Sequence, residues 1–199
     1  ADTPPRKEVQ LRAPLFEQGE KKLTPAEIGT AHHLFMQFCD FDAACAPNGV
    51  ENELNRLAEK KILSTEQAYA VDKRKIERFF ASDLYKTFMA ENKVRREFKF
   101  SVLVPAQAYF PVAADAPEEN VLLQGVIDCL IETDDGFVIL DFKTDRIKKG
   151  GADERAEQYR PQLAAYARAV HEIYGRPVRA CVLYFFHTGD TEWVSLDET

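Results

Sequence analysis

The sequence predicts an α/β fold, with a mixed central sheet that is flanked by helices and preceded by a helical region. Three observations support this prediction. Apolar residues recur at helical spacing within 24–92, strand-like runs begin at Lys93, and helical spacing returns at 154–174 before one or two last strands. Because helices are followed by three strands, one helix and further strands, we expect parallel and antiparallel neighbours in one sheet, with helices on both faces.

The N-terminal part is predicted to be helical after a short tail. Residues 1–23 are polar, contain prolines and lack periodicity, so we expect a tail or linker there. The first helix should begin at the cap Thr24, which is followed by Pro25 and Glu27, and should run to about Phe41. Several short amphipathic helices should follow up to residue 92. The predicted apolar positions are Ile28, Leu34, Phe35, Phe38 and Phe41, then Ile76, Phe79, Phe80, Leu84 and Phe88.

The C-terminal part is predicted to be the sheet core, at 93–199, so that 24–199 form a single domain. The helix at 154–174 contains Pro161, so we expect its regular part to start only at Arg160 or Pro161. The run at 178–186 is almost entirely apolar, which indicates an internal strand. The other strands are predicted at 96–104, at 193–196 and on either side of the turn at 134–136, with a Pro/Ala/Glu-rich loop at 105–120.

Length and charge limit the function classes. A chain of 199 residues can bury one sizeable core. It has no apolar run near the roughly 20 residues that span a bilayer, and no signal pattern at its start. The first residue is not Met, so we expect a fragment of a longer chain. The net charge of −7 argues against a stand-alone basic nucleic-acid binder, although an acidic metal site would itself add negative charge.

The cysteines argue against a metal cage. None of Cys39, Cys45, Cys129 and Cys181 forms a C-x-x-C pair, so the sequence offers no support for a zinc or iron–sulfur site. Cys129 and Cys181 lie in apolar strand runs and should be plain buried thiols. Free thiols of this kind are typical of a reducing cytoplasm.

The candidate site lies in two apolar strands joined by an Asp-Asp-Gly turn. One strand carries Asp128 and the other carries Asp141, with Lys143 two residues later. A carboxylate in an apolar strand is costly unless a partner compensates its charge. The simpler alternative is that Asp141 and Lys143 form a local salt bridge while Asp128 caps the hairpin. The apolar context of both aspartates favours a metal site instead.

The chemistry that suits this pattern is phosphodiester hydrolysis. Carboxylates prefer a hard divalent cation such as Mg²⁺, for which Mn²⁺ should substitute, and such a cation can activate water and offset phosphate charge. Asp128 and Asp141 are the candidate ligands, and the backbone carbonyl of Phe142 could add a third oxygen. Lys143 shares a strand face with Asp141, where it could hold the attacking water or stabilise developing charge.

Four motifs together resemble a known family. They are Gly29-Thr-Ala-His-His33, Gly125-Val-Ile-Asp128, Leu140-Asp-Phe-Lys-Thr-Asp145 and Tyr159-Arg-Pro-Gln-Leu-Ala-Ala-Tyr-Ala167. In this order the sequence resembles the PD-(D/E)XK nucleases, and most of all the nuclease domain at the C-terminus of RecB-like and AddA-type helicase–nuclease subunits. The resemblance covers about residues 24–186 and implies a restriction-endonuclease-like fold.

The resemblance also implies residue roles. Asp128 and Asp141 would bind the metal, His33 would be an additional ligand, and Lys143 would be the catalytic lysine. Gln162 and Tyr166 would flank the site and position the lysine or DNA, whereas Glu97 would lie near the site or in a structural ion pair. His32 is the alternative to His33, because adjacent helical residues face about 100° apart. We choose His33 because it follows Gly29 by four residues, as in the motif.

The function that the resemblance implies is a metal-dependent DNA nuclease, exonucleolytic in the parent enzyme, that acts in double-strand break processing and recombinational repair in the cytoplasm. Its partners would be DNA, the helicase domains of the parent chain and a second nuclease/helicase subunit in a heterodimer, with no membrane. That second subunit carries an iron–sulfur cluster, whose pattern the cysteines here do not match. Two alternatives stay open: an inactive nuclease-fold module that binds DNA or a partner subunit, and a free-standing phage-type or CRISPR-associated exonuclease.

Overall fold

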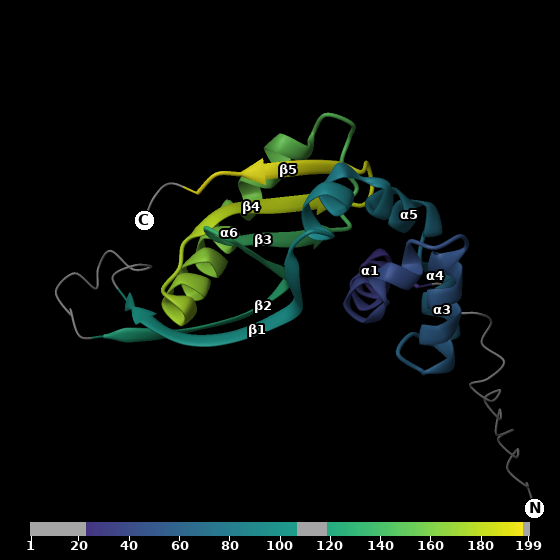
Figure 1. Cartoon of the computed structure of the whole chain (residues 1–199), viewed down its shortest axis with the longest axis horizontal. Helices are drawn as coiled ribbons and strands as arrows, with labels where there is room; N and C mark the ends of the chain where they lie inside the picture. The colour runs from purple at the N-terminus through teal and green to yellow at the C-terminus, as the bar shows by residue number, and fades with distance from the viewer. Residues whose placement is uncertain (1–22, 107–118, 197–199) are drawn as a thin grey trace, which may run out of the picture.

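The computed structural model of the chain describes residues 23–106 and 119–196. Within them one mixed sheet has the strand order β1-β2-β3-β4-β5 (Figure 1). β3 and β4 are parallel, and the other neighbours are antiparallel. The predicted α/β class and mixed sheet are therefore confirmed. The strands are β1 (Lys93–Pro105), β2 (Asn120–Thr133), β3 (Gly136–Lys143), β4 (Val178–Phe185) and β5 (Asp190–Val194).

Helices cover both faces of this sheet, as predicted (Figure 1). One face carries the N-terminal helices and the other carries α6 (Ala152–Tyr174). None of the helices in the described ranges is both long and apolar enough to span a membrane. The N-terminal elements are α1 (Pro25–Phe38), α2 (Phe41–Ala44), α3 (Gly49–Glu59), α4 (Thr65–Ala70), α5 (Lys73–Ala81) and the π-helix η2 (Leu84–Met89). Apart from residue 23, the predicted tail lies outside the described residues, as does most of the predicted loop at 105–120.

The first helix begins where predicted but ends earlier. The Thr24 hydroxyl accepts the Glu27 N–H at 3.3 Å, while the Glu27 carboxylate accepts the Thr24 N–H at 2.7 Å. The helix stops at Phe38 rather than Phe41, because Asp40 caps a separate helix, α2. The predicted apolar face is therefore wrong in part, and Phe38 is 42% exposed. The buried residues of α1 are Gly29, Ala31, His32, Phe35 and Met36.

Two further boundaries differ from the prediction. α6 starts at Ala152 and continues through Pro161, so the proline does not delay the helix. Its missing N–H removes one hydrogen bond, but Ala156 and Leu163 on either side are buried against the sheet and hold both halves in line. The last strand, β5, lies at 190–194 instead of 193–196, where it pairs with β4. β4 lies between β3 and β5, so the predicted internal strand is confirmed.

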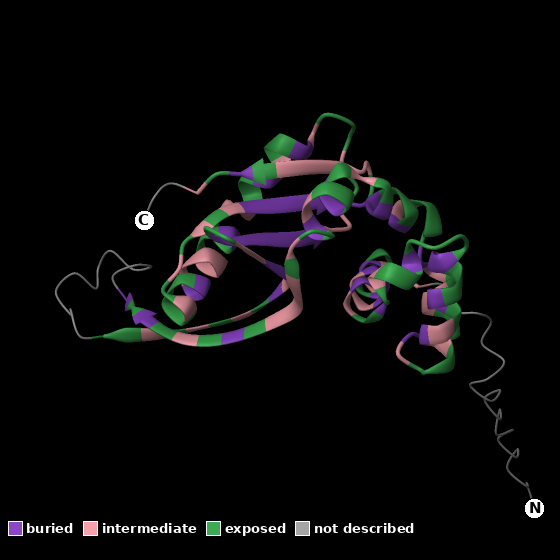
Figure 2. Cartoon of the chain, in the orientation of Figure 1, coloured by how far each residue is buried: buried purple, intermediate pink, exposed green. Residues whose placement is uncertain are grey.

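The core consists of two layers separated by β3 and β4, which are buried along most of their length (Figure 2). Side chains alternate between the two faces of a strand. On β3, Leu140 and Phe142 pack toward the N-terminal helices, whereas Phe137 and Ile139 pack toward α6. The same alternation directs Asp141 and Lys143 to the α6 side. A strand that is apolar on both faces thus ends in two charged groups that α6 covers.

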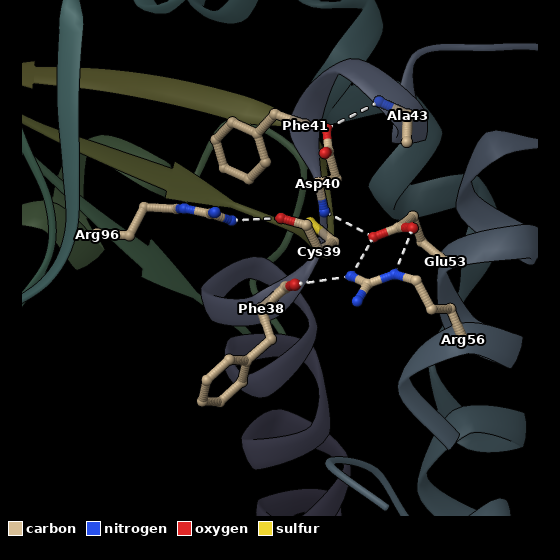
Figure 3. A pocket seen from close by; sticks show the side chains of 8 residues that line it. All are labelled: Phe38, Cys39, Asp40, Phe41, Ala43, Glu53, Arg56 and Arg96. Carbon is tan, nitrogen blue, oxygen red and sulfur yellow. Dashed lines mark hydrogen bonds and ion pairs between the residues drawn. The ribbon is translucent and has the colours of Figure 1, made fainter. Parts of the chain in front are cut away.

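Arg96 of β1 joins the helical part to the sheet (Figure 3). Its guanidinium donates to the carbonyl groups of Met36 at 3.0 Å and Cys39 at 2.5 Å, and lies 4.5 Å from the ring centre of Phe41. These contacts satisfy carbonyl groups at the end of α1 that have no partner within the helix. A hollow of about 520 Å³ lies beside this joint. The joint therefore sets how α1 lies against the sheet.

Candidate active site

The site forms where β2 and β3 separate. Their ladder ends at the pair Cys129 and Leu140. Beyond it the Asp128 carboxylate replaces the backbone partner, since its Oδ2 accepts the Phe142 N–H at 2.7 Å. The N–H and C=O of one residue in an antiparallel ladder point to the same side. The Phe142 carbonyl therefore faces the same gap as Asp128, where the sequence analysis expected an additional oxygen ligand.

Asp141 and Lys143 form a buried ion pair beside this gap. Lys143 Nζ lies 2.6 Å from Asp141 Oδ2, and the two side chains are 12% and 6% exposed. Burial and the charge of Asp128 raise the pKa of Asp141 to about 6, although the lysine opposes this change. The salt bridge between Asp141 and Lys143 that the simpler alternative expected is therefore present, but the pair is not isolated. It lies next to a second carboxylate whose charge the lysine does not fully offset.

The two histidines of α1 have different environments. His33 Nδ1 lies 3.3 Å from Asp128 Oδ1, so this side chain faces the gap. Burial lowers the pKa of His33, but the hydrogen bond and charge of Asp128 outweigh burial and raise it. His32 is 3% exposed, lies 2.8 Å from the Ile28 carbonyl oxygen and packs on Phe186. His32 is therefore a core residue, and only His33 is oriented as a ligand would be.

Gly29 explains how α1 approaches the strands so closely. A Cβ at this position would lie 2.7 Å from the Thr144 hydroxyl oxygen, just beyond the end of β3. Any other residue would therefore force the Thr144 side chain to rotate or α1 to move away from the sheet. Because His33 lies about one turn further along the helix, this close approach brings its imidazole to Asp128. The glycine and the histidine of the first motif thus act together.

The α6 residues Gln162 and Tyr166 continue the contacts from Lys143. The Lys143 ammonium donates to Gln162 Oε1 at 3.1 Å, and Gln162 Nε2 donates to the Tyr166 hydroxyl at 2.8 Å. Burial and the charge of Asp141 raise the pKa of Tyr166, which keeps its hydroxyl protonated. A Cβ on Gly125 would lie 3.2 Å from the Tyr166 ring and closer still to Phe100, so the glycine makes room for this tyrosine.

Glu97 lies across the β1–β2 ladder from Asp128, in a left-handed backbone conformation with φ 50°. The ladder skips this pair: Arg96 pairs with Cys129 and Phe98 pairs with Ile127. Burial and the Asp128 charge raise the pKa of Glu97. Within the described residues Glu97 forms no ion pair and no side-chain hydrogen bond. Of the two expected locations, the structure favours a place near the site.

Three residues around Lys143 had no role assigned from the sequence, although Asp145 and Tyr159 stand within the quoted motifs. The ammonium lies 3.8 Å from the ring centre of Tyr159, whose hydroxyl donates to Asp145 at 2.6 Å. Arg155 donates to the other oxygen of Asp145 at 2.8 Å. A signal was present in the sequence, since Tyr159, Gln162 and Tyr166 are spaced i, i+3 and i+7 and share one helix face.

The donor set suits a hard divalent cation. Two carboxylates, one imidazole and one backbone carbonyl converge on the gap from α1, β2 and β3, and burial together with the charge of Asp128 raises the pKa of Asp141. In residues 23–106 and 119–196 no three His, Cys, Asp or Glu side chains are already arranged around a common metal position. Asp141 contacts Lys143, and Asp128 contacts His33 and Phe142. Asp141 Oδ2 is therefore occupied by the lysine, and a cation would take this oxygen only in exchange for the lysine contact.

The fold, the paired carboxylates and the lysine define the class of protein. The chain belongs to the PD-(D/E)XK nuclease superfamily, whose family model matches residues 6–195. Members of this superfamily generally use divalent metal ions.

Among curated proteins the chain is similar to ATP-dependent helicase/nuclease subunits of the AddA type. The identity is 42% over 176 residues for Desulforamulus reducens, 41% over 176 residues for Pelotomaculum thermopropionicum and 42% over 188 residues for Moorella thermoacetica. These alignments cover 88%, 88% and 93% of the chain, but only 14%, 14% and 13% of the relatives. The chain therefore spans about 14% of the length of the curated relatives that it matches.

Proposed function

We propose that this chain is the Mg²⁺-dependent deoxyribonuclease domain of an AddA-type ATP-dependent helicase–nuclease. The observation that carries the proposal is the convergence of His33, Asp128, Asp141 and Lys143 from three elements. Family membership makes phosphodiester hydrolysis the natural chemistry for such a group. The names of the relatives, and the small part of them that the chain spans, support a place within a larger helicase–nuclease.

In this proposal Asp128, Asp141, His33 and the Phe142 carbonyl hold the cation. A bound divalent cation would offset negative charge on the phosphate and lower the pKa of a bound water. Mg²⁺ suits the oxygen-rich donors, and Mn²⁺ suits the imidazole as well. If Asp141 Oδ2 exchanged the Lys143 ammonium for the cation, the ammonium would become available to the substrate.

The side chains around the cation then act on the substrate. Lys143 stabilises negative charge on the phosphate oxygen or holds the attacking water, since an ammonium donates up to three hydrogen bonds. Gln162 keeps the ammonium in place from α6, and Tyr166 orients Gln162. Glu97 lies close enough to Asp128 for the charge of Asp128 to raise its pKa.

The partners follow from the parent enzyme. The substrate is DNA, and the helicase domains of the parent chain feed single strands to the site, so that cleavage is exonucleolytic. A second nuclease/helicase subunit completes a heterodimer that processes double-strand breaks for recombinational repair. The cytoplasm is the compartment that such a role requires.

The test is cleavage of labelled single-stranded, double-stranded and circular DNA with Mg²⁺, Mn²⁺ or EDTA. Asp141→Ala should abolish both metal binding and cleavage. Lys143→Ala should keep metal binding and lose roughly a hundredfold or more in turnover, as for loss of a transition-state stabiliser. Two exposed residues outside the four motifs serve as controls: Lys60→Ala, directly after α3, and Asp134→Ala, in the turn between β2 and β3. Metal-dependent DNA binding without any cleavage by the wild type would indicate an inactive binding module and refute the proposal.

A further inference from the structure

Lys143 is held by three contacts, and only two of the contacting residues, Asp141 and Gln162, were assigned a role from the sequence. Its ammonium carries three N–H groups. One contact is to Asp141 at 2.6 Å and one is to Gln162 at 3.1 Å. The third is the face of Tyr159, whose ring centre lies 3.8 Å from Nζ. A cation at this distance over an aromatic face is attracted by the negative potential of the ring.

Tyr159 is itself fixed in place. Its hydroxyl donates to Asp145 Oδ2 at 2.6 Å, and Arg155 donates to Asp145 Oδ1 at 2.8 Å. Asp145 follows β3 by two residues, while Tyr159 and Arg155 lie one turn apart on α6. The ring is therefore tied to the segment that directly follows the strand carrying the lysine. Burial and the bond to Asp145 raise the pKa of Tyr159 to about 12, so the hydroxyl stays a donor.

The contact between Lys143 and Tyr159 would remain if Asp141 turned away from the ammonium. If Asp141 took up a cation with Oδ2, it would leave the ammonium, which would remove the shortest of the three contacts. Gln162 is a single neutral acceptor on the solvent-facing side. The ring of Tyr159 is held by strand and helix together and does not depend on Asp141. Without it a long, flexible lysine would have one hydrogen bond to define its position.

We propose that Tyr159, anchored by Asp145, is a positioning residue that keeps the Lys143 ammonium in the site after Asp141 has exchanged it for metal. Tyr159 acts through the lysine and does not touch the reacting atoms. The inference rests on the proposed nuclease function for its kinetic part. The holding of Lys143 can be measured separately, in the absence of metal.

The first measurement is the acylation rate of Lys143 by acetic anhydride in EDTA, followed by peptide mass spectrometry, with exposed Lys60 of the same molecule as the reference. All variants are made in an Asp141→Ala background, which removes the Asp141 contact without metal. Tyr159→Leu removes the ring, whereas Tyr159→Phe keeps it. Tyr174→Leu is the matched control, because Tyr174 is a half-buried tyrosine of the same helix whose hydroxyl is also hydrogen-bonded, by Arg95 at 2.6 Å. We expect faster labelling of Lys143 in Tyr159→Leu only. Unchanged labelling in Tyr159→Leu, or an equal rise in Tyr174→Leu, would overturn the inference.

The second measurement is turnover on labelled DNA with saturating Mg²⁺. Tyr159→Leu should lose about ten- to a hundredfold in kcat, as for a misplaced catalytic group, with KM and metal affinity close to wild type. Tyr159→Phe should restore most of this loss, and Tyr174→Leu should lower only the thermal midpoint. Wild-type kcat in Tyr159→Leu would refute the positioning role. A wild type that cuts no DNA would instead refute the proposed function, and the labelling result would then decide the inference alone.

Discussion

Replacing Asp141 by asparagine should stabilise the metal-free protein at neutral pH, although it removes one partner of an ion pair. Burial and the Asp128 charge raise the pKa of Asp141 from 3.8 to about 6 despite the nearby Lys143. A carboxyl group whose pKa rises on folding destabilises the folded state once it is ionised. At 1.36 kcal/mol per pKa unit, this displacement corresponds to about 3 kcal/mol. The isosteric asparagine carries no charge and should recover about 1–3 kcal/mol of it.

The gain should depend on pH in a defined way. Well below 3.8 the carboxyl group is protonated in both the folded and the unfolded chain, so Asp141→Asn should change little. Between 3.8 and about 6 the unfolded chain ionises first, and the wild type loses stability as the pH rises. Above about 6 both states are ionised, and the difference between wild type and Asp141→Asn is constant. Urea unfolding in EDTA at a series of pH values measures this difference directly.

Asp145→Asn provides the control of opposite sign. Burial tends to raise the pKa of Asp145, but the hydrogen bonds from Tyr159 and Arg155 outweigh it and lower the pKa. This carboxylate therefore stabilises the folded state above its unfolded pKa, and its replacement should cost stability at neutral pH. An Asp141→Asn protein that is no more stable than wild type at neutral pH would refute the reasoning. A gain of equal size at all pH values would refute it as well.

Three further variants test other parts of the structure. His33→Ala should weaken Mn²⁺ binding in calorimetry, while His32→Ala should mainly lower the thermal midpoint; equal effects on binding would contradict the assigned orientations. The hydrogen bond from Arg56 lowers the pKa of Glu53 below its ordinary 4.5, so Glu53→Gln should destabilise by about 1–3 kcal/mol at neutral pH, and the deficit should shrink as the pH falls below 4.5. Arg96→Ala removes two charged hydrogen bonds to α1 and should cost about 2–4 kcal/mol in urea unfolding as well as weaken Mn²⁺ binding; unchanged metal affinity would mean that this joint does not position His33.

Local patterns in the sequence predicted most of the fold. The apolar run of β4, the alternation of β1 and the capping box at Thr24 each involve residues close in sequence, where periodicity and hydrogen-bonding preference act directly. The errors at helix boundaries came from competition between neighbouring signals. Asp40 stops α1 by capping α2, and packing around Pro161 carries α6 through a residue that favours a break. Such outcomes depend on tertiary contacts that a local pattern does not contain.

The motifs predicted which side chains would lie together in the site, but not the contacts that fix their positions. The spacing of Gly29 and His33 predicts a shared helix face, whereas the contact of Gly29 with Thr144 depends on where α1 lies on the sheet. The bond between Asp128 and the Phe142 N–H likewise depends on the point at which β2 and β3 part. The role of Tyr159 was missed because an aromatic residue on an amphipathic helix is ordinarily read as core. The role of Asp145 was missed because its hydrogen bonds depend on where α6 lies relative to β3.

The backbone at Glu97 shows why the site occurs at this point of the sheet. Arg96 reaches the carbonyl groups of α1, whereas Phe98, two residues later, packs on Tyr174 of α6. In a regular strand both side chains would lie on the same face. The left-handed conformation at Glu97 costs about 1–3 kcal/mol for a residue other than glycine, and it switches the face between them. The paired strand switches as well, since Ile127 packs in the layer of α6 and Cys129 in the layer of the N-terminal helices. Asp128 lies where β2 switches faces, so its carboxylate reaches the Phe142 N–H and His33 instead of entering either core layer. A strand that alternated without interruption would have buried this carboxylate in one of the two layers.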